Sequence, residues 1–168
     1  IKTATKGRTT EYINMNRAVR QGDPLAPLLF DIVMNALHKG YRTRGGYQLE
    51  GGPYISSVGY CDDTAILAST MEQLREMNKW TAQFFGEQNF NISIAKTYVT
   101  GRHKDGSELG PEDTVEWPLD GSKLVHKTQD QSVAHLGLMI NMKLDWTAQH
   151  QKMNGFVHKI AATIRTGQ

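Results

Sequence analysis

The sequence predicts an α/β (α+β) fold in which helices cover one face of an antiparallel sheet. The length of 168 residues suits one compact domain. Two strand-like runs, 54–60 and 64–68, are rich in β-branched, aromatic or apolar residues and flank a short turn, which indicates a central β-hairpin. Segments 27–38 and 70–86 repeat apolar residues every three or four positions, as helices with one buried face do.

The N-terminal elements are predicted from turn and helix-start signals. Residues 1–5 and 11–16 are short strand candidates on either side of a turn at Lys6-Gly7-Arg8. Pro27 suits a helix start, where a missing N–H costs nothing, and the helix is expected to run to about His38. Its apolar stripe is predicted to pack under the sheet and consists of Leu29, Phe30, Val33 and Leu37.

A capping box is predicted at the start of the second helix. Either Thr70 with Gln73 or Ser69 with Glu72 can form it, and the pattern leaves both open. The predicted buried stripe of this helix consists of Leu74, Met77, Trp80 and Phe84.

The C-terminal third is predicted to contain two strands and one more helix. Residues 97–100 and 133–142 are the strand candidates, and the polar, Gly- and Pro-containing segment 101–130 between them indicates a long hairpin or an ordered loop. Asp145 can cap the last helix. The apolar stripe of that helix consists of Met153, Phe156, Val157, Ile160 and Ile164.

Composition and charge restrict the class of protein. No apolar run approaches the roughly 20 residues that span a bilayer, so no membrane partner is expected. The single cysteine, Cys61, excludes an intrachain disulfide and favours a reducing, intracellular compartment. Residues 1–20 carry five basic residues against one acidic residue, and residues 143–168 carry four against one. Basic flanks around an acidic centre suit a metal site bordered by phosphate-binding surfaces, although a solvated mixture of charges explains them equally well.

Two adjacent carboxylates, Asp62 and Asp63, stand at the predicted hairpin turn. Like charges repel and are costly to desolvate, so a bound divalent cation is one reading and an ordinary Asp-rich turn is the other. Mg²⁺, or Mn²⁺ in its place, accepts carboxylate oxygens while keeping waters and substrate phosphates in its shell. Because successive strand residues point to opposite faces, both can serve one metal site only if the turn redirects one of them. We assign Asp62 as the main ligand.

Two motifs resemble those of the reverse transcriptases of non-LTR (LINE-type) retrotransposons. They are the run Arg-Gln-Gly-Asp-Pro-Leu-Ala-Pro-Leu-Leu-Phe at residues 20–30 and Tyr-Cys-Asp-Asp at residues 60–63. Farther on, residues 94–97 around Lys96 are similar to the lysine-bearing motif of the family's palm, and His135-Leu136-Gly137 resembles its primer-grip strand. The resemblance implies a polymerase palm core over residues 1–142 and the start of the thumb over residues 143–168. Ala26 and His135 depart from the serine and tyrosine that are usual there.

The resemblance implies roles for the acidic pair and a lysine. Asp62 and Asp63 would be the catalytic, metal-binding residues, with Asp62 on the ions and Asp63 in support. Lys96 would neutralise the triphosphate or protonate the pyrophosphate leaving group, while a solvated lysine is the alternative.

The nucleotide- and template-binding residues implied are Arg20, Gln21, Gly22 and Tyr60, and the primer grip would be His135, Leu136 and Gly137. Gly22 would allow close approach of a nucleotide backbone, with a helix-entry loop as the alternative. Arg20 would meet a phosphate or make a surface salt bridge. Tyr60 would pack near the primer or nucleotide, or in the core.

The activity implied is that of an RNA-directed DNA polymerase, a nucleotidyltransferase that extends a DNA primer on an RNA template with deoxynucleoside triphosphates. In a eukaryotic host it would be nuclear. The family places a further metal-binding aspartate and the fingers upstream of residue 1, so the remainder of a parent polymerase is an expected partner and the chain alone is expected to be inactive. The rival functions are a non-catalytic polymerase-derived scaffold that binds RNA or protein, an intron-encoded maturase, and an unrelated metal-dependent phosphohydrolase. The sequence upstream of this chain would distinguish a non-catalytic scaffold from a polymerase, and the domains downstream would identify a maturase. A phosphohydrolase would leave the motif at residues 21–24 unexplained.

Overall fold

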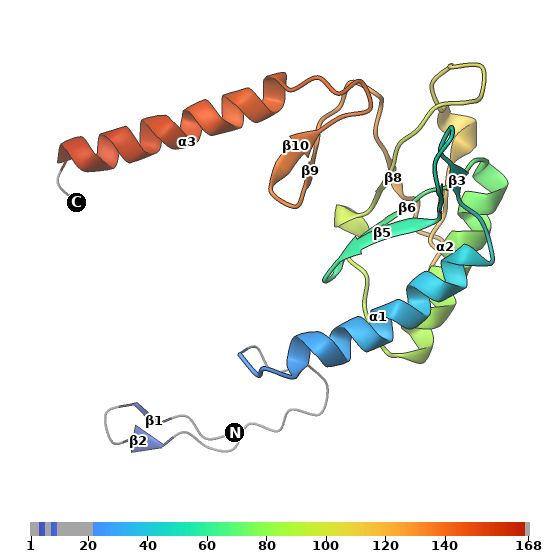
Figure 1. The fold of residues 1–168 in the computed structure, drawn as a ribbon, viewed down its shortest axis with the longest axis horizontal. Coiled ribbons are helices and arrows are strands. Elements are labelled where there is room, and N and C mark those ends of the chain that lie inside the picture. The colour runs from blue at the N-terminus through green and yellow to red at the C-terminus, as the bar shows by residue number, and fades with distance from the viewer. Residues whose placement is uncertain (1–3, 6–7, 10–21, 167–168) are drawn as a thin grey trace. The chain divides into compact units, whose positions relative to one another are not determined.

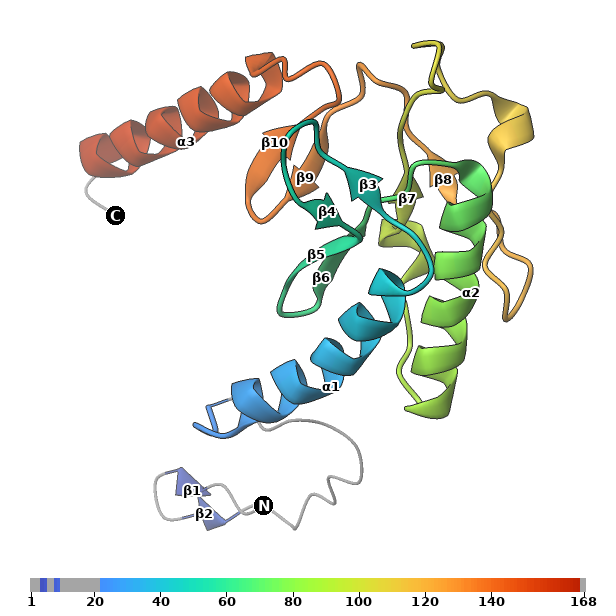
Figure 2. The same cartoon turned by 45° about the vertical axis from the view of Figure 1, so that its right-hand side comes forward.

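The computed structural model describes residues 4–5, 8–9 and 22–166, which combine helices with short strands (Figures 1 and 2). The chain divides into two compact units, Ile1–Ala36 and Leu37–Gln168. The α-helices are α1 (Ala26–Arg42), α2 (Met71–Glu87) and α3 (Thr147–Thr166). The strands are β1 (Ala4–Thr5), β2 (Arg8–Thr9), β3 (Tyr47–Gln48), β4 (Tyr54–Ile55), β5 (Ser57–Tyr60), β6 (Asp63–Ile66), β7 (Tyr98–Val99), β8 (Val125–His126), β9 (Val133–His135) and β10 (Leu138–Ile140). This mixture agrees with the predicted α+β class.

The described strands pair two by two and do not form the single antiparallel sheet that the sequence predicts. Neighbours along the chain form the antiparallel pairs β1–β2, β3–β4, β5–β6 and β9–β10, whereas β7 and β8 pair in parallel. No strand in the described ranges exceeds four residues, and such short ladders offer few hydrogen bonds to a third strand. The predicted strand 11–16 lies outside the described residues.

Helix α1 begins where the sequence predicts and ends one turn later than predicted. The Leu25 N–H donates to the Asp23 carboxylate at 2.9 Å, and the Ala26 N–H donates to the Asp23 carbonyl at 3.1 Å, so Asp23 is a turn residue as expected. The apolar stripe predicted for α1 is only partly buried, because Leu37 is fully buried while Leu29 is 56% exposed. Periodicity identifies an apolar face, but it does not tell which half of that face is covered.

The C-terminal turns of α1 are bound to α2 by two polar links. The Tyr41 hydroxyl lies 2.7 Å from the Thr81 hydroxyl in a buried contact, and burial raises the pKa of Tyr41 to about 12, partly offset by that hydrogen bond. The indole N–H of Trp80 donates to the Leu37 carbonyl at 3.1 Å, and the Arg44 guanidinium stacks 4.1 Å from the Trp80 ring centroid. These contacts make the end of α1 a rigid support for whatever packs on it.

The other side of α2 packs against residues 101–130, which the sequence predicts only as a polar loop or hairpin. This segment is ordered, and its apolar residues enter the core of the unit Leu37–Gln168. The Asn78 side chain also donates to the Glu116 carbonyl at 2.8 Å. The buried cluster consists of Ala82, Val99, Leu109, Val115, Trp117 and Leu124. In the predicted α2 stripe, Met77 and Phe84 are buried as expected.

A side-chain cap starts α2, and its removal is expected to cost stability. The Thr70 hydroxyl accepts from the Gln73 N–H at 3.2 Å, which selects Thr70 as the cap. The Gln73 side chain accepts from the Ser69 N–H at 3.1 Å and not from the Thr70 N–H, so the predicted capping box is formed only in part. We expect Thr70→Ala to lower the free energy of unfolding by about 1 kcal/mol, measured by urea denaturation. The control Gln83→Ala, on the exposed face of α2, should change it by less than about 0.5 kcal/mol. Equal effects of the two variants would contradict the cap.

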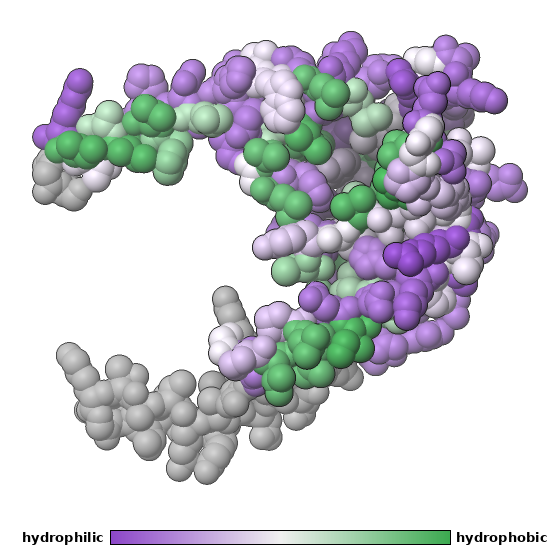
Figure 3. Space-filling model, viewed as in Figure 1, coloured by the Kyte–Doolittle hydropathy of each residue, from purple (hydrophilic) through white to green (hydrophobic). Residues whose placement is uncertain are grey.

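The predicted strand 133–142 is a hairpin instead, and it is attached to α3. Leu136 and Gly137 form its turn with φ of 49° and 82°, so the chain reverses after three residues of β9. The Thr147 N–H donates to the Asp145 carboxylate at 2.9 Å, which confirms the predicted cap of α3. Figure 3 shows the apolar stripe of α3 on the surface, where its five side chains are 45–75% exposed. None of the helices in the described part of the chain combines the length and the apolarity that crossing a bilayer requires.

Candidate active site

The acidic pair lies at the tip of the predicted hairpin, labelled β5 and β6 in Figure 1. Tyr60 of β5 pairs with Asp63 of β6, so Cys61 and Asp62 form a two-residue turn. Cys61 has φ of 52°. A positive φ at the first turn residue is a feature of hairpin turns, whose twist matches that of the strands. The predicted hairpin is confirmed, but Asp63, which the sequence predicts at the turn, is the first residue of β6, and residues 54–55 of the predicted first strand pair with β3 instead.

The two carboxylates occupy different positions on this hairpin. Asp63 is the first residue of β6, and it lies close enough to Tyr98 of β7 for its charge, after burial, to raise the pKa of the tyrosine hydroxyl. Asp62 lies in the turn, where the alternation of strand side chains does not fix its direction. Both are exposed, so neither is desolvated by the fold.

These carboxylates fit one part of a Mg²⁺ site. They are hard oxygen donors at an exposed tip, where waters and phosphate oxygens can fill other coordination positions. Within residues 4–5, 8–9 and 22–166, no three His, Cys, Asp or Glu side chains converge as a metal-binding group. Asp62 and Asp63 would therefore need further ligands from substrate, water or other protein segments.

Tyr60 lies on the hairpin beside the acidic pair, whereas Lys96 lies on a separate element. Tyr60 is 66% exposed, which rules out the core alternative for this side chain. Lys96 ends a short 3-10 helix, Ile94–Lys96, two residues before Tyr98. It is exposed, and none of the ion pairs found in the described ranges includes it. Its catalytic role stays a prediction.

The predicted nucleotide-binding residues are only partly described. Arg20 and Gln21 lie outside the described residues. Gly22 belongs to the first compact unit and has φ of 91°, although a Cβ there would meet no atom within 4 Å. The backbone conformation, rather than lack of space, explains the glycine at this position.

The predicted primer-grip residues lie together in the β9–β10 hairpin. His135 ends β9 and pairs with Leu138, while Leu136 and Gly137 form the turn. The Lys152 ammonium of α3 donates to the Gly137 carbonyl at 2.5 Å. The hairpin turn and the first turns of α3 are therefore joined.

Sequence reasoning missed His38, which lies on α1 against β5. Its Nδ1 lies 2.7 Å from the Ser57 hydroxyl, and a Cβ added at Gly59 would be 2.5 Å from its Nε2. The ring also meets the Tyr41 ring edge-on, with centroids 6.0 Å apart. A glycine inside a strand often marks a close approach, so Gly59 was the available signal.

The protonation of His38 is expected to make stability depend on pH. Burial, followed by the nearby Arg42 charge, lowers the pKa of His38. The unfolded chain then binds a proton at His38 more readily, so stability falls as the pH drops through about 6.5 toward the folded pKa and is unaffected above that range. Urea denaturation between about pH 8 and 5 should show a loss for the wild type that His38→Asn reduces. The same pH profile in both proteins would contradict this account.

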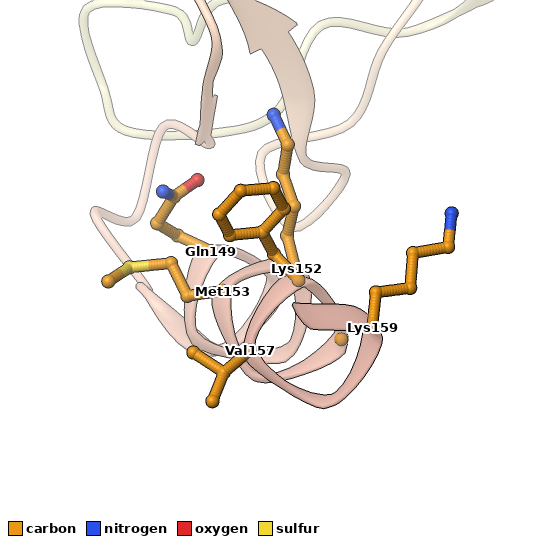
Figure 4. A pocket seen from close by; sticks show the side chains of 7 residues that line it. Gln149, Lys152, Met153, Val157 and Lys159 are labelled. Carbon is orange, nitrogen blue, oxygen red and sulfur yellow. The ribbon is translucent and has the colours of Figure 1, made fainter. Parts of the chain in front are cut away.

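A surface hollow lies on α3, and one of its lining residues, Lys152, is the lysine that donates to the Gly137 carbonyl. Figure 4 shows Lys152 and Lys159 extending in a different direction from the apolar Met153 and Val157. The hollow is lined by Gln149, Lys152, Met153, Gly155, Phe156, Val157 and Lys159. None of the predicted catalytic or metal-binding residues lines this hollow, so the candidate active site is the hairpin tip.

The chain is similar to known retrotransposon proteins. Residues 2–140 match the family described as reverse transcriptase (RNA-dependent DNA polymerase). The chain is 44% identical over 104 residues to the retrovirus-related Pol polyprotein from type-1 retrotransposable element R2 of Nasonia vitripennis. The aligned region covers 62% of this chain and 10% of that protein. It is 29% identical over 103 residues to the corresponding R2 polyprotein of Popillia japonica, over 57% of this chain and 17% of that protein. For the type-2 R2DM polyprotein of Drosophila melanogaster, the identity is 27% over 95 residues, or 56% of this chain and 9% of that protein.

The chain spans about a tenth of the length of the first of these relatives. The family match nevertheless covers most of the chain, including both motifs on which the resemblance rests. Because of this match, the chain belongs to the reverse transcriptase family. The three relatives are all proteins of R2 elements, which places the chain among the enzymes of non-LTR retrotransposons, as its sequence predicts.

Proposed function

We propose that this chain is the palm core and the start of the thumb of an RNA-directed DNA polymerase. The parent enzyme would extend a DNA primer on an RNA template with deoxynucleoside triphosphates. One observation carries the proposal: Asp62 and Asp63 are both exposed at the tip of a two-residue hairpin turn, in a chain of the reverse transcriptase family.

The residues of the hairpin would hold the metal and align the primer end. A bound Mg²⁺ or Mn²⁺ ion supplies positive charge that favours the alkoxide form of the primer hydroxyl and neutralises phosphate oxygens. Asp62 would be its main ligand, with Asp63 in support. The exposed Tyr60 ring, paired across the hairpin with Asp63, offers a flat surface for the primer end or the nucleotide. The primer 3′-hydroxyl would attack the α-phosphate, and Lys96 would neutralise or protonate the departing pyrophosphate.

The proposed palm includes residues 1–142, and the proposed thumb begins with residues 143–168. Helix α3 starts within the second range, at Thr147. Two hydrogen bonds attach it to the primer-grip hairpin: Lys152 donates to the Gly137 carbonyl, and the Met139 N–H donates to the Gln149 side chain at 2.8 Å. These bonds support a thumb whose first helix holds the primer grip in place.

The 168 residues alone are proposed to be inactive. A two-metal site needs ligands that converge from more than one element, whereas the described residues offer the carboxylates of one hairpin. Templated synthesis by the isolated chain would contradict this part of the proposal.

Primer extension on an RNA template tests the function. The polymerase that contains this chain should extend a DNA primer in the presence of Mg²⁺ and deoxynucleoside triphosphates. Chelation of the metal or the Asp62→Ala substitution should abolish extension. A folded wild-type polymerase without extension activity would instead favour the non-catalytic scaffold.

A further inference from the structure

We propose that His38 is a positioning residue for the acidic turn. It fixes β5 on α1 through a hydrogen bond to Ser57 and through contact with the bare backbone of Gly59. The inference rests on the proposed function, because the position of the turn has consequences only if Asp62 and Asp63 bind metal.

The two contacts of His38 lie on one face of β5. Ser57 and Gly59 are two residues apart, and side chains at such positions in a strand point to the same side. The imidazole spans both positions, with Nδ1 at 2.7 Å from the Ser57 hydroxyl and Nε2 over Gly59. Tyr60 belongs to the opposite face, where it is 66% exposed. The supported face and the face proposed for substrate are therefore different.

The far side of His38 is also held. Its ring meets that of Tyr41, which is fully buried and bound to Thr81 of α2 at 2.7 Å. A series of contacts therefore runs from α2 through α1 to β5. Because the ring is tethered at Nδ1 and bounded by Tyr41, it cannot easily move away from a side chain at position 59.

The lack of space beside His38, and not the backbone conformation, requires a glycine at position 59. It is absent from the glycines with positive φ in the described part of the chain, so an alanine would fit the strand if His38 were absent. With His38 present, a Cβ at 2.5 Å from Nε2 has to move by about 1 Å before the contact becomes an ordinary one. Such a displacement of a reacting group can cost about 100-fold in rate.

The displacement would reach the carboxylates directly. Gly59 pairs with Thr64, and the next pair, Tyr60 with Asp63, closes the turn. Asp63 thus lies one ladder step from the position that His38 supports, and Asp62 precedes it in the turn. A shift of β5 on α1 moves both carboxylates as a unit.

The test is a double-mutant cycle in the polymerase that contains this chain. Gly59→Ala is expected to lower kcat for primer extension about 100-fold and to weaken Mn²⁺ binding, measured by electron paramagnetic resonance on the protein without substrates. The double variant His38→Asn with Gly59→Ala is expected to recover most of both losses. Asparagine keeps a polar atom near the position of Nδ1 for Ser57, but it lacks the ring atoms that meet Gly59.

Two further variants serve as controls. Gly86→Ala on α2 makes the same chemical change where a Cβ would meet nothing within 4 Å, and it should leave activity and Mn²⁺ binding unchanged. Ser57→Ala keeps the space over Gly59 and removes the hydrogen bond, so it should lower kcat about tenfold while leaving KM for the nucleotide within about twofold. If Gly59→Ala does not fold, the kcat of Ser57→Ala tests whether His38 positions the turn.

The outcomes separate this inference from the proposed function. No recovery in the double variant would mean that Gly59 serves another purpose, such as close approach of substrate, and would overturn the role of His38. Wild-type kcat in Ser57→Ala would overturn it as well. A wild-type polymerase that binds Mn²⁺ but extends no primer would contradict the proposed function alone, and the Mn²⁺ cycle would still decide whether His38 positions the turn. A wild type that binds no Mn²⁺ would overturn both.

Discussion

Asp62→Asn is expected to lower the rate of RNA-templated primer extension at least about 1,000-fold. Asparagine has nearly the same size as aspartate, so the loss reflects the charge and the second ligand oxygen. Charge stabilisation by a metal is worth several kcal/mol, and each 1.4 kcal/mol is tenfold in rate. Asp62 lies in the turn, where its direction is not set by strand alternation, and it is the carboxylate that we assign as the main ligand.

The matching change at Asp63 is expected to cost less, about 10- to 100-fold, as is usual for a group that supports a metal ligand. Asp63 begins β6 and lies near Tyr98, which suits a carboxylate that supports the site from the strand. The measurement is kcat at saturating nucleotide and Mg²⁺ for both variants. The exposed Glu50, changed to glutamine, controls for loss of a surface charge and should leave kcat unchanged. A larger loss at Asp63 than at Asp62 would reverse the assignment.

Trp117→Ala is expected to lower the free energy of unfolding by about 3–5 kcal/mol, the largest effect on stability that we foresee. Trp117 is 5% exposed and packs in the cluster that joins α2 to the segment after β7. Removing the indole leaves a cavity that neighbouring side chains can fill only in part. Urea denaturation measures the change.

Leu119 supplies the matched control in the same segment. It is 62% exposed, so Leu119→Ala should change the free energy of unfolding by less than about 0.5 kcal/mol. Similar effects at both positions would mean that this segment does not contribute to the core.

The local elements could be predicted because their signals lie within a few neighbouring residues. The cap at Thr70, the cap at Asp145 and the β5–β6 hairpin follow from residue types a few positions apart. The missed reversal at Leu136 has a physical reason: a leucine with φ of 49° is uncommon in a turn, and Gly137 alone was too weak a signal to divide the strand.

Contacts between distant segments could not be predicted in this way. The parallel pairing of Tyr98 with Val125 and the burial of Trp117 join segments that no periodic pattern connects. In the candidate site, the adjacent aspartates were visible as a motif. His38 was not, because its contact with Ser57 spans 19 positions and only Gly59 hinted that something lies close to the strand.

The two-residue turn between β5 and β6 makes chain length itself a constraint on the acidic pair. In a strand, moving the register by one residue turns every following side chain to the other face. One residue inserted after Cys61 would either bulge out of the turn or shift β6, so that Asp63 no longer lies opposite Tyr60. A deletion there would bring Thr64 into that place. Relatives that keep this hairpin should therefore vary in the side chain at position 61 much more readily than in the number of turn residues.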